Sequence, residues 1–290
     1  MIRLSNAVCA TAAISFCIFL PACSPDAPTA VRATPASTVA LDRGGNPQPG
    51  VHLRYGRPVK VGNGRARTYV AFNAKEGRAP VEIGIALDQK VLDGLPTDGM
   101  MYPFILNFPK HSPAPYQFAE LDWNPHGHEP PNIYTFPHFD FHFYTISLAE
   151  RNSITPSDPQ FAAKARNVPT GDFVPPFYIV PGDPAAVAVP QMGVHWSDVR
   201  SPELQGLLGH PENYQQFTKT FIYGSWNGRY TFLEPMITIA YLQTHPNAVQ
   251  DISVPGRYPL AGYYPTQYRV QYDAKAKEYR IALTGLVARQ

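Results

Sequence analysis

The sequence predicts a mostly β protein, folded as a single antiparallel domain of sandwich or barrel type with a few short helices. Its 290 residues include 32 prolines, 17 tyrosines and 16 phenylalanines. Proline breaks helices and aromatic residues favour strands, so this composition indicates many short strands joined by structured loops. Asn227-Gly228 and Gly62-Asn63-Gly64, each between two apolar runs, are typical of hairpin turns.

The first 22 residues predict an export signal. Arg3 precedes an apolar run over residues 7–20, which ends in Leu20-Pro21-Ala22-Cys23. A charged start and a short apolar run that ends in small residues are typical of secretory signals, and this run is too short to span a bilayer. Its resemblance to bacterial lipoprotein signals implies cleavage before a lipidated Cys23. Ser24 behind it implies delivery to the outer membrane, with the protein facing the periplasm.

The remainder predicts a tether followed by one domain. Residues 23–48 are rich in Pro, Ala, Thr and Gly, which is typical of a flexible tether, and residues 49–290 are expected to form the mostly β domain. Cys9, Cys17 and Cys23 all lie in the signal or at its end, so thiol catalysis, internal disulfides and thiolate metal sites are excluded. Loss of Arg3 lowers the net charge from +2 to about +1, which excludes a strong attraction to nucleic acid.

The N-terminal half of the domain is predicted to consist of strands and one short helix. Asp88 is suited to cap a helix over residues 89–93, and Gly94 is suited to end it. The first three predicted strands form a meander, because turn residues separate them. The predicted strands of this half cover residues 59–61, 66–72, 81–87, 102–108, 117–123 and 138–144.

The C-terminal half is predicted to begin with two short helices, over residues 147–151 and 158–166. The proline density over residues 169–190 then predicts a long ordered loop on the surface. Asn227-Gly228 and the Lys-rich segment 274–277 predict two further hairpins. Their strands are expected to cover residues 217–223, 229–233, 268–272 and 278–287.

Histidine is concentrated between Trp123 and Tyr144, where four of the nine histidines lie close to Glu129 and Asp140. The stretch 138–144 alternates polar and aromatic residues with a period of two, which predicts a strand with one buried face. Phe139, Phe141 and Phe143 are expected to enter a core. The opposite face is expected to carry His138, Asp140, His142 and Tyr144.

Imidazole and carboxylate groups without thiolate favour a divalent metal, with zinc as the first candidate and iron or manganese open. In a straight strand, residues four apart have Cα atoms about 13 Å apart, so His138 and His142 are badly placed for one tetrahedral ion. Either the strand is bulged, or Asp140 and one histidine form the near pair while the other histidine supports them. The predicted ligands are His128, His138, Asp140, His142 and, from a later loop, His195.

Four blocks of the sequence resemble the signature of an uncharacterised bacterial family of exported proteins, often lipoproteins. The blocks are Gly127-His128-Glu129-Pro130, residues 137–144, residues 192–196 and residues 232–236, and the likeness extends over about residues 58–240. The resemblance implies a mostly β, self-associating domain with no settled activity. It also implies that one site contains His128, His138, His142, His195 and Glu234.

The sequence therefore predicts a lipid-anchored envelope protein with a His/carboxylate metal site. One alternative is a metal-dependent hydrolase or lyase acting on a small periplasmic substrate, with Glu129 or Glu234 as the base for a metal-activated water. A second alternative is a structural envelope protein in which the histidines form a metal-free network. The G-x-S-x-G, P-loop and G-x-G-x-x-G motifs of other enzyme classes are absent from the sequence.

Overall fold

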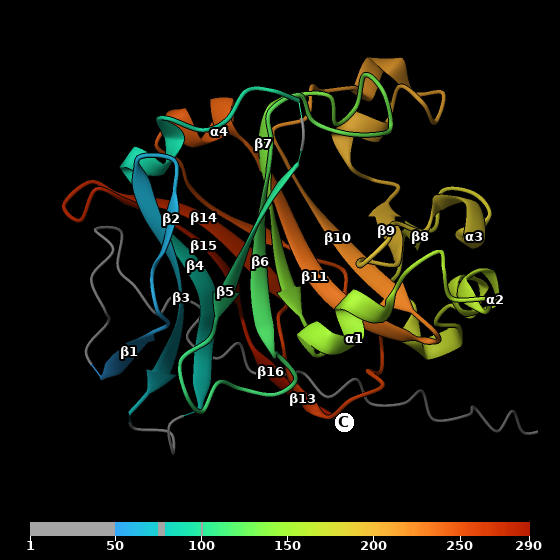
Figure 1. Cartoon of the computed structure of the whole chain (residues 1–290), viewed down its shortest axis with the longest axis horizontal. Coiled ribbons are helices and arrows are strands. Elements are labelled where there is room, and N and C mark those ends of the chain that lie inside the picture. Colours follow the sequence, from blue (N-terminus) through green and yellow to red (C-terminus); the bar gives the residue numbers. More distant parts are fainter. Residues whose placement is uncertain (1–49, 75–78, 100) are drawn as a thin grey trace, which may run out of the picture. The chain divides into compact units, whose positions relative to one another are not determined.

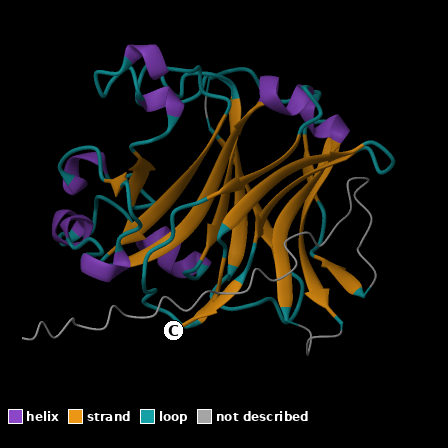
Figure 2. Ribbon diagram, turned by 180° about the vertical axis from the view of Figure 1, so that it is seen from behind, coloured by secondary structure: helices purple, strands orange, loops and turns teal. Residues whose placement is uncertain are grey.

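A computed structural model describes residues 50–74, 79–99 and 101–290. The predicted signal peptide, Cys23 and almost all of the tether lie outside these residues. The described chain forms two seven-stranded antiparallel sheets and one two-stranded sheet (Figures 1 and 2). The two large sheets pack face to face through one hydrophobic core, to which both contribute side chains. The predicted fold class, a mostly β sandwich, is confirmed.

The first large sheet contains the predicted meander. Val59 pairs with Ala66 and Val61 with Gly64, so the hairpin at residues 62–63 forms as predicted. The C-terminal hairpin also forms, but its second strand ends at Thr284, and a separate strand follows. In spatial order the sheet contains β1 (Val51–Tyr55), β3 (Gly64–Asn73), β4 (Pro80–Asp88), β15 (Glu278–Thr284), β14 (Gln267–Asp273) and β12 (Asn247–Asp251), with β2 (Val59–Val61) paired to β3.

The second large sheet carries the histidine-rich strand near its middle. Two of its strands fall where loops are predicted: β8 lies within the proline-rich segment 169–190, and β9 contains His195, which is predicted from the sequence to lie in a later loop. In spatial order the sheet contains β5 (Tyr102–Asn107), β6 (Phe118–Asn124), β7 (His138–Tyr144), β11 (Arg229–Thr238), β10 (Lys219–Trp226), β9 (Val194–Asp198) and β8 (Tyr178–Ile179). The small sheet pairs β13 (Gly262–Tyr264) with β16 (Val287–Arg289).

The helices are short, and three of the four α-helices begin at a capping side chain, on Ser147, Asp183 and Thr238. Ser147 accepts a hydrogen bond from the backbone N–H of Glu150, whose side chain reaches back to residue 147 and completes a capping box. The predicted helix after Asp88 is a 3₁₀ turn, η1 (Gln89–Leu92), capped by that aspartate. Within the described residues, no helix is long and apolar enough to cross a bilayer. The α-helices are α1 (Leu148–Ser153), α2 (Phe161–Arg166), α3 (Pro184–Val187) and α4 (Ile239–Gln243).

The inner face of β7 lies in the core, as its alternating sequence predicts. Phe139, Phe141 and Phe143 are fully buried, and the ring of Phe139 lies 5.0 Å from that of Trp123 on β6. Burying a phenylalanine side chain stabilises the fold by about 1.5–3 kcal/mol, so these three residues fix which face of β7 looks inward.

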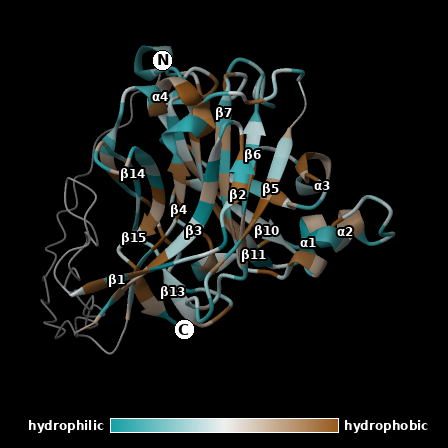
Figure 3. Cartoon of the chain, turned by 60° about the vertical axis from the view of Figure 1, so that its left-hand side comes forward, coloured by the Kyte–Doolittle hydropathy of each residue, from teal (hydrophilic) through white to brown (hydrophobic). Residues whose placement is uncertain are grey.

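The outer face of β7 is buried too, so the prediction of one buried face is wrong. All seven residues of the strand are buried. Segments before and after β7 cover this face through two small apolar clusters, one around Tyr144 and Phe232 and one around Tyr134 and Met236. Helices α1 to α3 lie on the side of the molecule where β8 to β11 run (Figure 1). Figure 3 shows hydrophilic and hydrophobic residues mixed along the labelled strands.

Candidate metal centre

Strand pairing gathers polar side chains from β6 and β7 on the outer face of the second sheet. Residues directly opposite each other in an antiparallel pair point to the same face. Three of the four facing pairs on this side are polar and buried, and the fourth is the aromatic pair of Phe118 and Tyr144. The polar pairs are Glu120 with His142, Asp122 with Asp140, and Asn124 with His138.

Strands on the other side of β7 bring in a carboxylate and a histidine. Leu233 faces Phe143 and Met236 faces Asp140, which places Glu234 across from His142. His195 on β9 is in register with Gly224 on β10. A Cβ at Gly224 would lie 2.2 Å from the ring of Phe232, so only glycine lets this ring settle there. The Phe232 ring centroid lies 4.6 Å from that of His142 and 5.3 Å from that of His195.

The predicted site residues fall into two groups of three, each with two histidines and one carboxylate. We call His128, His138 and Asp140 the first triad, and His142, His195 and Glu234 the second triad. Within each triad the three candidate ligand atoms all lie within 4.8 Å of one another. Sequence alone suggests one shared site, because the register of β9, β10 and β11 against β7 cannot be read from it.

In the first triad, both histidines point Nε2 at Asp140. His138 Nε2 lies 3.0 Å from Asp140 Oδ1, and His128 Nε2 lies 3.6 Å from Asp140 Oδ2. Gly127 places His128 here, since it has a positive φ of 69° and a Cβ would lie 1.9 Å from the carbonyl oxygen of Tyr134. His138 is fully buried, whereas the side chain of His128 is 39% exposed.

Backbone carbonyls fix which nitrogen of these two rings carries a proton. The Nδ1 of His138 lies 2.6 Å from the carbonyl oxygen of Phe136, and the Nδ1 of His128 lies 2.7 Å from that of Glu129. A carbonyl only accepts, so each Nδ1 donates, and in the neutral ring Nε2 presents a lone pair. Oδ2 of Asp140 already accepts a hydrogen bond of 2.7 Å from the Asn124 amide. With both rings neutral, two lone pairs converge on a carboxylate, so a positive charge, either a metal ion or a proton added to one ring, is needed to satisfy all three groups.

The second triad is built around His142. Its Nε2 lies 3.4 Å from Glu234 Oε1, and its Nδ1 lies 3.3 Å from Asp122 Oδ2. His195 Nε2 lies 3.9 Å from Glu234 Oε2. A metal-binding histidine usually has a carboxylate or carbonyl beside the ring nitrogen that does not bind the ion, and Asp122 lies in that position for His142. His142 and Glu234 are buried, and the side chain of His195 is 23% exposed.

Burial sets the protonation of the second triad. It lowers the pKa of His142 to about 4 and that of His195 to about 3, so both rings are neutral at pH 7, the form that binds metal. Burial, followed by the nearby Asp140 and Asp122, raises the pKa of Glu234 well above its usual range. Without a cation nearby, the ionised form of these crowded carboxyl groups is thus unfavourable here.

Two carboxylates on this face, Glu120 and Asp122, were not predicted from the sequence. We call the paired polar residues of β6 and β7, together with Glu234, the polar row. Burial and then Asp140 raise the pKa of Asp122, and burial and then Asp122 raise that of Glu120 to about 7. Although burial acts in the opposite direction, His138 and then His128 hold the pKa of Asp140 well below its usual range. Arg151 of α1 donates to Glu120. The alternation of Glu120, Asp122 and Asn124 with apolar residues was a usable signal, whereas nothing in the sequence pointed to Arg151.

Several buried atoms of this row have no hydrogen-bond partner within the described residues. An unsatisfied buried polar atom costs about 1–3 kcal/mol, so a cluster of them indicates a place where a bound group would satisfy them. The unpartnered atoms are Nε2 of His138, Oδ1 of Asp140, both oxygens of Asp122, both ring nitrogens of His142, Oε2 of Glu120 and Oε2 of Glu234.

The two predicted catalytic bases occupy different positions. Glu234 is a member of the second triad, where its carboxylate lies between two imidazoles. Glu129 is exposed, and its contact with His128 uses the backbone carbonyl. His126, the remaining histidine of the rich stretch, is exposed as well and belongs to neither triad.

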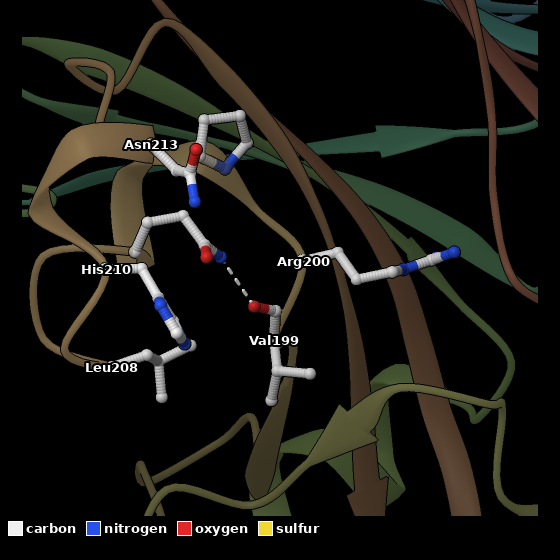
Figure 4. A pocket seen from close by; sticks show the side chains of 7 residues that line it. Val199, Arg200, Leu208, His210 and Asn213 are labelled. Atoms are coloured by element: carbon white, nitrogen blue, oxygen red, sulfur yellow. Dashed lines mark hydrogen bonds between the residues drawn. The ribbon is translucent and has the colours of Figure 1, made fainter.

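A cavity of about 590 Å³ lies elsewhere, over the segment between β9 and η4 (Pro211–Asn213). Its wall includes Val199, whose carbonyl accepts a hydrogen bond of 2.7 Å from the Gln205 amide, while Arg200 extends away from the other labelled residues (Figure 4). No triad residue lines this cavity. The candidate metal centre therefore lies apart from this cavity, on the covered outer face of the second sheet.

Comparison of the sequence with protein-family models and with curated proteins finds no match. Comparison of the structure with solved structures finds none either. The resemblance to exported bacterial proteins therefore stays a prediction, and the geometry of the two triads is the main guide to function.

Proposed function

We propose that this protein is a lipid-anchored envelope protein that binds a divalent transition-metal ion in the polar row on the outer face of its second sheet. One observation carries the proposal: Nε2 of His138 and Oδ1 of Asp140 lie 3.0 Å apart, both buried and both without a hydrogen-bond partner among the described residues. The Nδ1 of His138 faces a carbonyl, so its Nε2 is a free lone pair in the neutral ring.

Spacing within the triads supports a metal ion. Bonds of about 2.1 Å to a tetrahedral ion leave neighbouring ligand atoms about 3.4 Å apart. The two histidines of the first triad contact different oxygens of Asp140, at 3.0 and 3.6 Å, and those of the second triad contact different oxygens of Glu234, at 3.4 and 3.9 Å. The contacts of 3.4 Å and more are too long for good N–H···O hydrogen bonds, which rarely exceed about 3.2 Å.

The ligand set favours zinc. Neutral imidazole and carboxylate bind zinc readily, and they also accept iron or manganese. A metal-free histidine network is the competing explanation. It requires an added proton in each triad, on His138 in the first and on Glu234 in the second, and it leaves the 3.9 Å contact of His195 unexplained.

A metal-dependent hydrolase or lyase is a second candidate function. Each triad supplies three protein ligands, which leaves one tetrahedral position for water, as in catalytic zinc sites. One histidine of each triad reaches the surface, which favours access from solvent. Metal-dependent hydrolysis of simple esters or phosphate esters by the purified protein, lost on chelation, would support this candidate.

The proposal is tested by the metal content of the full chain purified without chelator. We expect at least one transition-metal ion per wild-type chain and less in His138→Ala and His195→Ala. His210→Ala is the matched control, since His210 is exposed and belongs to neither triad. Circular dichroism verifies that each variant is folded. Equally low metal content in the wild type and in both triad variants, before and after incubation with zinc, would refute metal binding.

A further inference from the structure

We infer that the row binds two metal ions, one in each triad, at separate positions. This inference rests on the proposed metal binding and concerns the number of ions and their arrangement. The two triads share no residue. Each triad has its own carboxylate and its own pair of imidazoles, so each one is a complete set of three ligands.

A single ion cannot replace the pair. His138 and His142 lie on the same straight strand with every residue between them in register with β6. Their Cα atoms are therefore about 13 Å apart, whereas an ion lies roughly 6 Å from the Cα of a histidine that binds it. An ion in the first triad consequently lies outside the reach of His195 and Glu234, which approach β7 at His142.

The triads also provide no bridging ligand, because no carboxylate belongs to both of them. Asp140 and His142 lie on the same face of β7 with Cα atoms about 6.6 Å apart, and they belong to different triads. Metal ions that share a bridging carboxylate lie about 3.5–4 Å apart. The geometry thus points to two mononuclear sites, each with an open position beside a partly exposed histidine, 39% exposed in His128 and 23% in His195.

Asp122 is the residue between the two sites. It faces Asp140 across β6 and β7, and its Oδ2 contacts Nδ1 of His142 at 3.3 Å. It is fully buried, and neither of its oxygens has a hydrogen-bond partner among the described residues. A negative charge in this position offsets the repulsion between two dications, and it orients the ring of His142. We therefore assign Asp122 as a positioning residue of the centre.

Stoichiometry tests the inference. The full chain, freed of metal with a chelator that is then removed, is titrated with Co²⁺ and with Zn²⁺, and bound ions are counted by equilibrium dialysis and elemental analysis. We expect two ions per wild-type chain, one in His128→Ala and one in His195→Ala. Both histidines are partly exposed, so these substitutions leave the core intact. The double variant should bind none, and His210→Ala should bind two.

Each other result has a definite meaning. Saturation of the wild type at one ion, whether that ion is lost from one variant or from both, overturns the two-site inference while the proposed metal binding stands. A wild type that binds no ion overturns both. Two ions that persist in both single variants would show that the ions bind outside the triads, which also overturns the inference. The Co²⁺ absorption spectrum adds an independent signal, because each variant should retain the bands of the remaining site alone.

Discussion

At the scale of single residues, the partner of each imidazole decides what the ring can bind. Backbone carbonyls hold Nδ1 of His128 and His138, and the carboxylate of Asp122 lies 3.3 Å from Nδ1 of His142. The nitrogen left over in each ring points at Asp140 or Glu234. These rings are oriented before any ion arrives, so little rotamer freedom is lost on binding.

Replacing Asp122 by asparagine should weaken the second site selectively. The amide keeps the size of the side chain but removes the charge that orients His142, and such supporting residues typically contribute 10–100-fold to metal affinity. We expect the dissociation constant of the ion in the second triad to rise by about that factor. Competition with a chromogenic chelator in the His128→Ala background measures it. In the His195→Ala background the same substitution should have a smaller effect, and equal effects in both would contradict this assignment.

Replacing Gly224 by alanine should destabilise the sheet beneath the second triad. The new Cβ would lie 2.2 Å from the ring of Phe232, which packs on His142 and His195. Overpacking of this kind costs about 1–3 kcal/mol. Urea unfolding should show this loss. Gly206→Ala is the control, since its Cβ would meet nothing closer than 3.7 Å, and a similar loss there would count against the packing explanation.

At the scale of elements, alternation predicted the orientation of β7 but not its environment. The period of two in residues 138–144 separates Phe139 from His138, and the structure places the phenylalanines in the core. The same alternation in β6 would have selected Asp122 and Glu120. Strands β8 and β9 were not predicted, because the first is two residues long and lies within a proline-rich segment, and the second is only five residues long. Short strands are defined by their partners rather than by their own sequence.

The cap of α1 should be measurable. Ser147 and Glu150 form a capping box, and the helix carries Arg151 to Glu120 at the end of the polar row. Ser147→Ala should lower the free energy of unfolding by about 1 kcal/mol. Ser157→Ala serves as a control on a nearby exposed serine. Unchanged stability in the Ser147 variant would show that the helix is held by its packing alone.

Glu203 in η3 (Pro202–Leu204) should make stability depend on pH. Burial raises the pKa of its carboxyl group in the folded state. Its stabilising contribution is therefore present below the unfolded pKa of about 4.5 and is lost as the pH rises through the folded pKa. Glu203→Gln should raise the unfolding midpoint relative to wild type at pH 7 and leave it nearly equal at pH 4. A variant that is less stable than wild type at pH 7 would exclude this explanation.

At the scale of the whole molecule, sequence predicted the sandwich but not the layer outside it. Hairpins at Gly62 and Asn227 and the terminal hairpin form where turn residues stand. Whether the outer face of β7 is open or covered depends on the path of residues 145–217, whose short elements carry little local signal. Likewise, the grouping of His142 with His195 and Glu234 depends on the order β7-β11-β10-β9, which results from long-range pairing.

Metal removal should lower the stability of the whole domain. Ions that bind only the folded state stabilise it by RT ln(1 + [L]/Kd), or about 2.7 kcal/mol at a hundredfold excess over the dissociation constant. For a domain of this size that corresponds to a shift in Tm of roughly 5–10 °C. Differential scanning calorimetry with zinc and with EDTA measures it. The variant with both His128 and His195 replaced by alanine should show no shift, and a shift of equal size there would mean that zinc acts elsewhere.

The two triads also differ in how far apart their members lie along the chain. His128 and Asp140 are 12 residues apart, whereas His142 and Glu234 are 92 residues apart. The entropy lost in closing a loop grows with its length, so the first triad assembles with less chain to order. During synthesis on the ribosome, its three members emerge before any residue of the second triad. In a newly made chain, all three ligands of the first triad are therefore present long before β9 and β11 supply the remaining ligands of the second triad.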